Sequence, residues 1–235
     1  PCHLSFEYQS SFQVFQLADF EETEQIHIHF SATNFHENWA QRILVSGCCN
    51  CNGKIIRYPA LDRDGIGPQS DRYVHLIIVG MSRMGIAMGV TAAHIAHYPN
   101  FVTQGIRTRI TFIDPEAGRE MDFLKGRYEA LFRLSHHTLR KSDGSGGETV
   151  CVHAPQEDFL DVEWEFIEGG IESPYVRKLL KDWTANEKAI PTLAVCGNSA
   201  PENVAAALYL PQQIYDRQIP IFVYQKETAT ILEIA

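Results

Sequence analysis

Apolar and polar positions divide the chain into two regions with different patterns. From Tyr73 onward, short apolar runs of strand length alternate with longer segments of helical period. Strands are predicted near residues 74–79, 108–113, 162–167, 192–196 and 219–224, with a last short strand at 229–233. Helices are predicted at about 82–97, 115–134, 174–182 and 200–210. The alternation predicts an α/β protein with a Rossmann-like, doubly wound, mostly parallel sheet over residues 72–235.

Residues 1–71 lack this alternation and predict an N-terminal β-containing extension, or a small α+β subdomain, that ends in a linker. The alternating run Gln25–Phe30 indicates a strand, and residues 38–44 indicate a short helix. Residues 42–46 and 54–58 flank a Cys-Asn-Gly turn, which indicates a hairpin. Residues 59–71 contain two Pro, two Gly and three Asp, a composition typical of a linker.

Composition narrows the class of protein. The chain of 235 residues has a formal net charge of −9, and its basic residues are scattered. Nucleic-acid grooves and anionic-membrane patches need clustered Lys and Arg, so both are disfavoured. No apolar run approaches the ~18–20 residues that span a bilayer, and the chain starts at Pro1 without a signal-like segment. We expect an excised segment of a longer protein.

The six cysteines point to a reducing compartment. They are fewer than a secreted disulfide scaffold would carry in a chain of this length. Cys151 and Cys196 fall within predicted strands, where a thiol usually behaves as a small buried hydrophobic group. We therefore predict a cytoplasmic protein, or the cytosolic part of a membrane-associated one.

The strongest candidate site follows the first strand of the α/β region. The sequence Gly80-x-Ser82-x-x-Gly85-x-x-x-Gly89 joins an apolar strand to a helix, which is the context that a dinucleotide-binding turn requires. Gly80 allows the tight turn, and Gly85 lets the helix pack close to the strand. The free N–H groups of the first helical turn, at Arg83 and Met84, then face a pyrophosphate. Ser82 replaces the usual middle glycine, and its hydroxyl can donate to a phosphate oxygen.

Asp114, at the end of the second strand, is the second candidate. A carboxylate there accepts hydrogen bonds from ribose hydroxyls and repels a 2′-phosphate, so it favours NAD or an adenosine nucleotide over NADP. It lies 34 residues after Gly80, against a usual spacing of ~20. The alternative interpretation is a helix N-cap before Pro115, and the two roles are compatible.

Four segments, in order, resemble the nucleotide-binding half of the potassium-transport regulator domains, the RCK, KTN or TrkA-N family. They are the glycine turn, the Phe-Ile-Asp-Pro-Glu segment at 112–116, the Gly-Gly turn and helix at 166–180, and the strand exit at 193–203. The resemblance covers about two thirds of the chain. It implies binding of NAD or NADH, or of ATP, ADP or AMP, and it adds the residues Pro115, Gly169, Gly170, Cys196, Gly197 and Asn198 to the site.

The chain also departs from this family. Gly170 stands where the family usually has an acidic residue, and residues 130–155 resemble an insertion. The first 71 residues match nothing in the family. The resemblance implies a homo-oligomer and partners such as a membrane transport subunit or further domains of a larger bacterial protein, for example ryanodine-receptor-type repeats.

The sequence favours a regulator over an enzyme. None of the nine tyrosines is followed four residues later by Lys, so the Tyr-x-x-x-Lys signature of short-chain dehydrogenases is missing. The pairs His136-His137 and Cys151-x-His153 lack an obvious nucleophile or base partner. We expect a non-catalytic, nucleotide-binding regulatory domain. The alternative is an NAD-dependent oxidoreductase or a fragment of one.

Cys48-Cys-Asn-Cys51 contains a Cys-x-x-Cys pair, which is half of a common zinc site. Cys2, His3, His27, His29 and His36 are the available further ligands, but no second paired motif accompanies them. Cys48 and Cys51 are therefore weak metal candidates. The other interpretation is a reduced hairpin turn.

Overall fold

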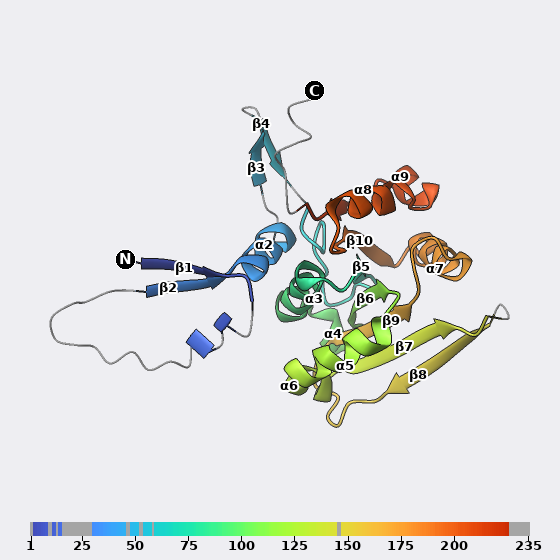
Figure 1. Ribbon diagram of the computed structural model, residues 1–235. Coiled ribbons are helices and arrows are strands. Elements are labelled where there is room, and N and C mark those ends of the chain that lie inside the picture. The colour runs from blue at the N-terminus through green and yellow to red at the C-terminus, as the bar shows by residue number, and fades with distance from the viewer. Residues whose placement is uncertain are drawn as a thin grey trace.

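The computed structural model describes residues 2–8, 11–12, 14–15, 30–45, 48–51, 54–57, 59–144 and 147–225, and for residues 2, 30, 48–51 and 54–57 it describes the backbone alone. Its centre is a seven-stranded sheet in the order β11-β10-β5-β6-β9-β7-β8 (Figure 1). The strands are β5 (Tyr73–Val79), β6 (Thr108–Asp114), β7 (His136–Ser142), β8 (Glu148–His153), β9 (Val162–Glu168), β10 (Ala189–Val195) and β11 (Ile221–Val223).

The order and direction of the strands confirm the predicted α/β, Rossmann-like architecture. Strand β5 has β6 and then β9 on one side, and β10 and then β11 on the other, with all five parallel. The chain runs outward from β5 to β9 and then crosses to β10 on the far side of β5. Ligands of open parallel sheets bind where the strand order reverses in this way, beyond the carboxyl ends of the strands.

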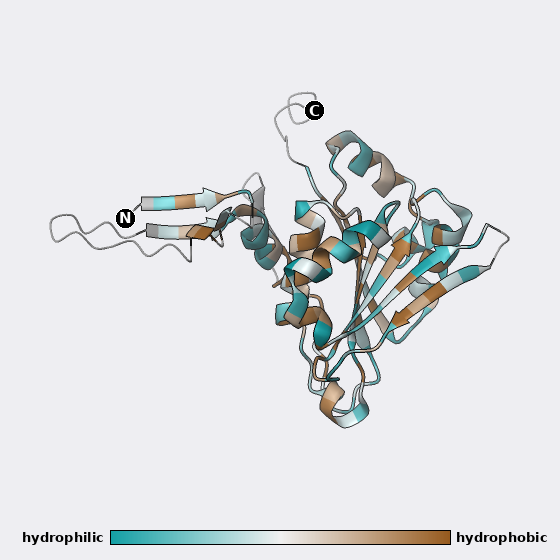
Figure 2. Ribbon diagram, turned by 60° about the horizontal axis from the view of Figure 1, so that its bottom comes forward, coloured by the Kyte–Doolittle hydropathy of each residue, from teal (hydrophilic) through white to brown (hydrophobic). Residues whose placement is uncertain are grey.

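Helices cover both faces of the sheet, because successive side chains of a strand point to opposite faces. In β5, Leu76 and Ile78 belong to one apolar cluster with α3 (Arg83–Ile95) and α5 (Ala117–Arg127). Ile77 belongs to a second cluster with α7 (Pro174–Ala185) and α9 (Gln212–Asp216). Figure 2 shows apolar residues along the central strands and polar residues on much of the helices. The short helices are α4 (Asn100–Gln104), α6 (Glu129–Arg133) and α8 (Ala200–Leu208).

The segment that resembles an insertion forms a hairpin that widens the sheet. Strand β7 pairs parallel with β9 and antiparallel with β8, so β8 becomes the outermost strand (Figure 1). The β7–β8 turn is short, because Ser142 at the end of β7 lies opposite Glu148 at the start of β8. The mostly parallel sheet therefore ends in one antiparallel strand.

The N-terminal region forms a second, smaller unit that packs on the Rossmann-like domain. Strands β1 (Cys2–Phe6) and β2 (Phe30–Asn34) are parallel and project from the body in Figure 1. Helix α2 (Phe35–Leu44) begins where the Asn34 side chain accepts a hydrogen bond from the Glu37 N–H (3.1 Å). Its buried Ala40 and Leu44 belong to the same apolar cluster as α3. Strands β3 (Cys48–Cys51) and β4 (Lys54–Arg57) form an antiparallel hairpin.

Some predicted elements are misplaced. Residues 42–44 continue α2 and are not a strand, so the first hairpin strand is β3. The predicted linker is packed: Leu61 and Ile66 are buried, and Arg63 donates to the Pro191 carbonyl (2.8 Å). The helix predicted over 115–134 is two helices, α5 and α6, that meet at the non-helical Tyr128 (φ −121°, ψ 47°). The strand predicted at 229–233, and all but the last residue of the one predicted at 25–30, lie outside the described residues.

Candidate functional site

The glycine turn after β5 has the geometry that its sequence predicts. Gly80 has φ 95°, and a Cβ there would lie 2.7 Å from the Gly197 backbone nitrogen. A Cβ on Gly85 would lie 2.2 Å from the Gly80 carbonyl oxygen. Both contacts are too short for any side chain, so these two positions require glycine. The turn brings α3 close against the carboxyl end of β5.

Ser82 is the N-cap of α3. Its Oγ accepts a hydrogen bond from the Gly85 N–H (3.4 Å), and this leaves the hydroxyl proton available for an acceptor in solution. The N–H groups of Arg83 and Met84 have no acceptor within the helix, as at every helix start. The Met84 side chain is buried in the core, so this residue offers its backbone alone to a ligand. Together these groups supply the donors that anion binding at a helix N-terminus uses.

Asp114 connects the ends of β5 and β6. Its Oδ2 accepts from the Met81 N–H (2.9 Å), and its Oδ1 accepts from the Glu116 N–H (2.9 Å). Each carboxylate oxygen keeps lone-pair capacity for a further donor such as a ribose hydroxyl. The N-cap position of α5 is Glu116, so Asp114 closes a turn around Pro115 before the helix and is not the cap itself. The carboxylate is thereby fixed beside the glycine turn.

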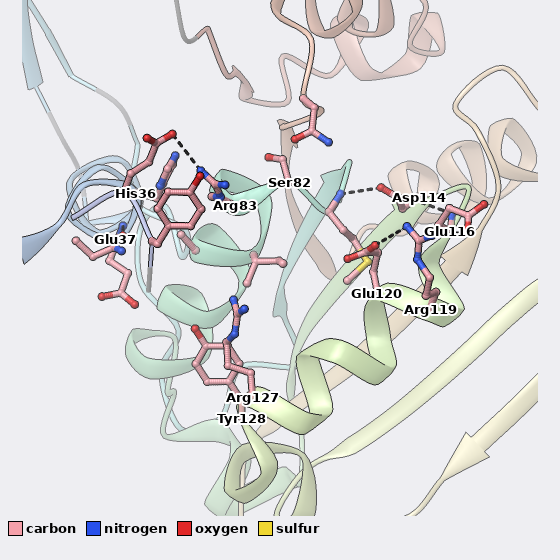
Figure 3. Close-up of a pocket in the computed structure, with 17 residues that line it drawn as sticks. His36, Glu37, Ser82, Arg83, Asp114, Glu116, Arg119, Glu120, Arg127 and Tyr128 are labelled. Atoms are coloured by element: carbon pink, nitrogen blue, oxygen red, sulfur yellow. Dashed lines mark hydrogen bonds and ion pairs between the residues drawn. The ribbon is translucent and has the colours of Figure 1, made fainter. Parts of the chain in front are cut away.

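A cavity of about 570 Å³ opens over these groups (Figure 3). Of the predicted site residues, Ser82, Arg83, Asp114 and Asn198 line it. The lining residues that the sequence did not indicate are Glu7, Tyr8, Asn34, His36, Glu37, Met81, Ile86, Ala87, Glu116, Arg119, Glu120, Arg127 and Tyr128. The cavity therefore runs from the glycine turn along α3, between α2 and α5.

The N-terminal unit supplies one wall of this cavity. Glu7 Oε1 lies 3.1 Å from Arg83 Nη1, and the Arg83 guanidinium carbon lies 3.7 Å from the centre of the Tyr8 ring. His36 and Glu37, from α2, complete this side (Figure 3). Nothing in the sequence indicates these contacts, because the partners are about 76 residues apart and belong to different units. Glu7 thus places a carboxylate beside the helix N-terminus that would receive a phosphate.

Charges of both signs line the cavity. Its carboxylates are Glu7, Glu37, Asp114, Glu116 and Glu120, and its guanidinium groups are Arg83, Arg119 and Arg127. Arg119 lies 3.0 Å from Glu120 Oε1 and 3.6 Å from Glu116 Oε2. Burial raises the pKa of Glu37 above its usual range. A polyanionic ligand would have to displace some of these carboxylates from their arginines.

The other predicted residues are not among those that line the cavity. Gly169, after β9, donates its N–H to the Asp114 carbonyl (3.1 Å), and a Cβ on Gly170 would meet no atom within 4 Å. Cys196 follows β10 and is buried, which raises the pKa of its thiol to about 12. The Gly197 N–H donates to Asn203 Oδ1 (2.7 Å), and Asn203 Nδ2 donates to the Tyr224 carbonyl (2.9 Å). These bonds fix the loops that border the turn.

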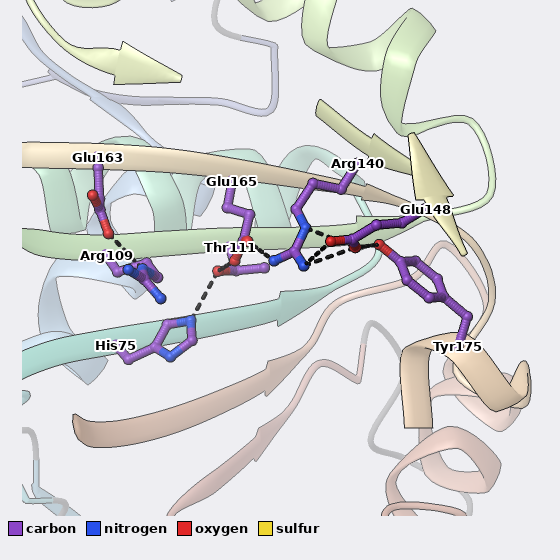
Figure 4. A network of polar contacts seen from close by, with 8 residues as sticks. All are labelled: His75, Arg109, Thr111, Arg140, Glu148, Glu163, Glu165 and Tyr175. Carbon is purple, nitrogen blue, oxygen red and sulfur yellow. Dashed lines mark hydrogen bonds and ion pairs between the residues drawn. The ribbon is translucent and has the colours of Figure 1, made fainter. Parts of the chain in front are cut away.

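A second polar cluster lies on the sheet face that carries α7 (Figure 4). The Thr111 hydroxyl donates its proton to Glu165 Oε2 (3.0 Å). Its oxygen can therefore only accept from His75 Nε2 (2.8 Å), so His75 Nε2 carries the ring proton. His75 is fully buried, and burial lowers its pKa well below 6.5. Its Nδ1 has no partner within the described part of the chain. His75 is thus a neutral core histidine whose tautomer is set by Thr111.

The cluster continues from Glu165 to the hairpin and to α7. Arg140 Nη1 donates to Glu165 Oε1 (2.6 Å), and Arg140 Nη2 donates to Glu148 Oε2 (2.7 Å). Tyr175, in the first turn of α7, donates to the same Glu148 oxygen (2.7 Å). The two carboxylates raise the pKa of Arg140. Arg140 therefore connects β9, the edge strand β8 and the start of α7.

The histidines that we considered as catalytic candidates lie on the hairpin. His137 and His153 are opposite each other, and their rings stack with centroids 4.6 Å apart. Burial, and then the nearby His153, lower the pKa of His137 to about 4, and both its ring nitrogens are without a partner among the described residues. His136 pairs with Asp158 (3.1 Å), and Cys151 is exposed. The geometry gives His137 and His153 a packing role.

Metal binding by Cys48 and Cys51 stays a prediction, because the structure describes only the backbone of this strand. Among the side chains that are described, no three His, Cys, Asp or Glu are placed to hold a metal ion. No helix in the described ranges has the length and apolar character needed to cross a membrane. Comparisons with protein-family models, with curated proteins and with solved structures gave no match.

Proposed function

We propose that the chain is a non-catalytic regulatory domain that binds an adenosine nucleotide, NAD or NADH first among them, at the carboxyl end of its parallel sheet. One observation carries the proposal. The glycine turn and Ser82 leave the N–H groups of Arg83 and Met84 open at the start of α3, beside the fixed carboxylate of Asp114. In Rossmann-type sheets, the N–H groups at the helix start bind the phosphate and the carboxylate after the second strand binds the ribose.

The cavity supports a ligand of this size. Ligand pockets usually have volumes of roughly 300–1,000 Å³, and this cavity of about 570 Å³ contains both Ser82 and Asp114. Asp114 favours a free 2′-hydroxyl and disfavours a 2′-phosphate, so NADP is the expected non-ligand. The missing Tyr-x-x-x-Lys signature supports sensing over hydride transfer.

The output that we propose is regulation of potassium transport, or of another activity of a longer, multidomain cytoplasmic protein. Its support is the resemblance of four segments to the RCK, KTN or TrkA-N domains. A nucleotide would act by shifting the population of two arrangements of domains or subunits, by as much as it binds one arrangement better than the other.

Thermal unfolding with NAD, NADH, ATP, ADP, AMP and NADP tests the binding. A ligand at 100 times its Kd stabilises the folded state by about 2.7 kcal/mol, and about 2–4 °C per kcal/mol is usual for a domain of this size, so the expected shift is roughly 5–10 °C. A shift with none of the six nucleotides would contradict the proposal. Steady loss of NADH absorbance at 340 nm with small carbonyl compounds would favour an oxidoreductase instead.

Calorimetric titration of the Asp114→Asn variant tests the site itself. Loss of a charged acceptor costs about 1.5–3 kcal/mol, so affinity for the bound nucleotide should fall roughly 10- to 100-fold. The control is Glu120→Gln, which removes another cavity carboxylate, one that pairs with Arg119 and accepts from no N–H of the glycine turn in the described residues. Equal affinity in both variants would reassign Asp114 to holding the Met81 and Glu116 N–H groups.

A further inference from the structure

Among the strands that the structure describes, β8 is the outermost of the seven-stranded sheet. It pairs with β7 on one side, and no strand in the described part of the chain pairs with its other side. Its sequence, Glu-Thr-Val-Cys-Val-His, contains no Pro, Gly or Lys, and five of its six residues are exposed. The opposite edge strand, β11, has three residues. Proteins usually shorten or charge a free edge to prevent pairing with another chain, and β8 shows neither protection along its middle.

Contacts at both ends hold β8 in an extended, pre-formed conformation. Glu148 is bound by Arg140 and by the Tyr175 hydroxyl. At the other end, the His153 ring stacks on the buried His137. A strand that is already ordered loses little conformational entropy when it pairs with another strand.

The exposed side chains of β8 are apolar on one face. Val150 lies opposite Arg140 and Val152 lies opposite Thr138, so both point to the face that carries α7. Their exposed fractions are 44% and 70%. Cys151, also exposed, points to the other face. These exposed side chains can therefore pack against the matching side chains of a second strand of similar composition.

We propose that β8 pairs antiparallel with β8 of a second copy of this chain, which joins the two seven-stranded sheets into one continuous sheet. Two identical antiparallel strands in one sheet are related by a two-fold axis that is perpendicular to the sheet. Rotation about this axis leaves each side chain on the same face of the sheet. Residues of even number must then face residues of even number. Of the registers that satisfy this condition, two pair five of the six residues of β8, with either Val150 or Cys151 on the axis.

The composition of β8 selects the register with Cys151 on the axis. In that register, Val150 faces Val152 of the partner subunit, and the pair occurs twice by symmetry. In the other register, Val152 faces Glu148 of the partner subunit, which sets an apolar side chain against a carboxylate held by Arg140. Matched apolar pairs across strands stabilise a sheet, whereas mismatched pairs do not.

This register makes a chemical prediction. Directly opposite residues in antiparallel strands have Cα atoms about 4.5–5.5 Å apart, and disulfides form over about 4.4–6.8 Å. Mild oxidation with diamide should therefore join Cys151 to Cys151 of the partner subunit. The two thiols lose two protons and two electrons, which reduce the diamide to its hydrazine, and one sulfur–sulfur bond forms.

The test combines light scattering with size-exclusion chromatography, over a dilution series, and non-reducing electrophoresis after diamide treatment. The wild type should be a dimer that crosslinks. Val152→Lys should weaken dimerisation roughly tenfold or more, because it buries a charge in the shared sheet. Val102→Lys, at a side chain that is 87% exposed on α4, is the matched control and should leave the dimer unchanged. Circular dichroism verifies that each variant is folded.

Cys151→Ser separates the crosslink from the association. This variant should dimerise like the wild type and form no diamide-dependent dimer. A wild type that is monomeric at its highest soluble concentration overturns the proposal, as does a dimer that Val152→Lys leaves intact. A dimer without the Cys151 crosslink, or a crosslink that persists in Cys151→Ser, overturns the register.

Discussion

Replacing Gly85 with Ala tests whether close approach of α3 to β5 determines the candidate site. A Cβ at this position would lie 2.2 Å from the Gly80 carbonyl oxygen, against a lower limit of 3.0 Å for real Cβ contacts. The difference is close to 1 Å. The atom that it meets belongs to the backbone, so no rotamer change can relieve the contact. The start of α3 and the glycine turn must separate.

The size of the effect follows from two opposing contributions. Overpacking against rigid atoms costs about 3 kcal/mol, at the upper end of the usual range. Alanine in place of glycine in a helix stabilises the folded state by about 1 kcal/mol. We expect Gly85→Ala to lower the free energy of unfolding by about 2 kcal/mol, and at about 2–4 °C per kcal/mol this lowers the Tm by roughly 4–8 °C.

Gly126→Ala is the matched control, because Gly126 is also helical and its Cβ would meet nothing within 4 Å. This substitution should raise stability by about 1 kcal/mol. The two variants should therefore differ by about 3 kcal/mol in urea unfolding followed by circular dichroism. Gly85→Ala should also lose nucleotide binding, since the anion site moves. Equal stability of the two variants would refute the close-approach argument.

Three further predictions concern stability, pH and ligand affinity. Arg140→Ala should destabilise the fold by about 3 kcal/mol in chemical denaturation, because it leaves the Glu165 carboxylate without its cation. Arg119→Ala, at a side chain that is 63% exposed, should leave the denaturation midpoint unchanged. His137 has a pKa of about 4 in the folded state, below the unfolded value of 6.5. The unfolded state therefore binds more protons in this range, and the free energy of unfolding should fall as pH drops from 6.5 to 4. Denaturant titrations across this pH range should show that His137→Phe removes the part of the loss that is due to His137. Glu7→Gln should raise nucleotide affinity a few-fold by calorimetry, since it frees Arg83 and removes a carboxylate beside the phosphate position.

The sequence was sufficient wherever neighbours along the chain carry the signal. The parallel strands, the helix that starts near Ser82 and the two glycines of the turn are local features, and the structure has them as predicted. Helix boundaries were less well predicted. The helix predicted over 115–134 breaks at Tyr128, where the backbone leaves the helical region.

Most of the residues that line the candidate site could not be predicted. The contact of Glu7 and Tyr8 with Arg83 depends on the packing of α2 against α3, through buried residues such as Ala40. The bond from the Met81 N–H to Asp114 joins residues 33 positions apart. A residue-by-residue pattern contains no information on such pairs.

The sequence by itself determined the fold class and the glycine turn, because hydrophobic period and backbone torsion are properties of short segments. Tertiary structure decided which side chains face the cavity, how Arg140 pairs with carboxylates of β8 and β9, and that β8 is the outermost strand among the described residues. Those features depend on which distant segments pack together to bury apolar surface. That choice belongs to the whole chain and is not encoded in any one part of it.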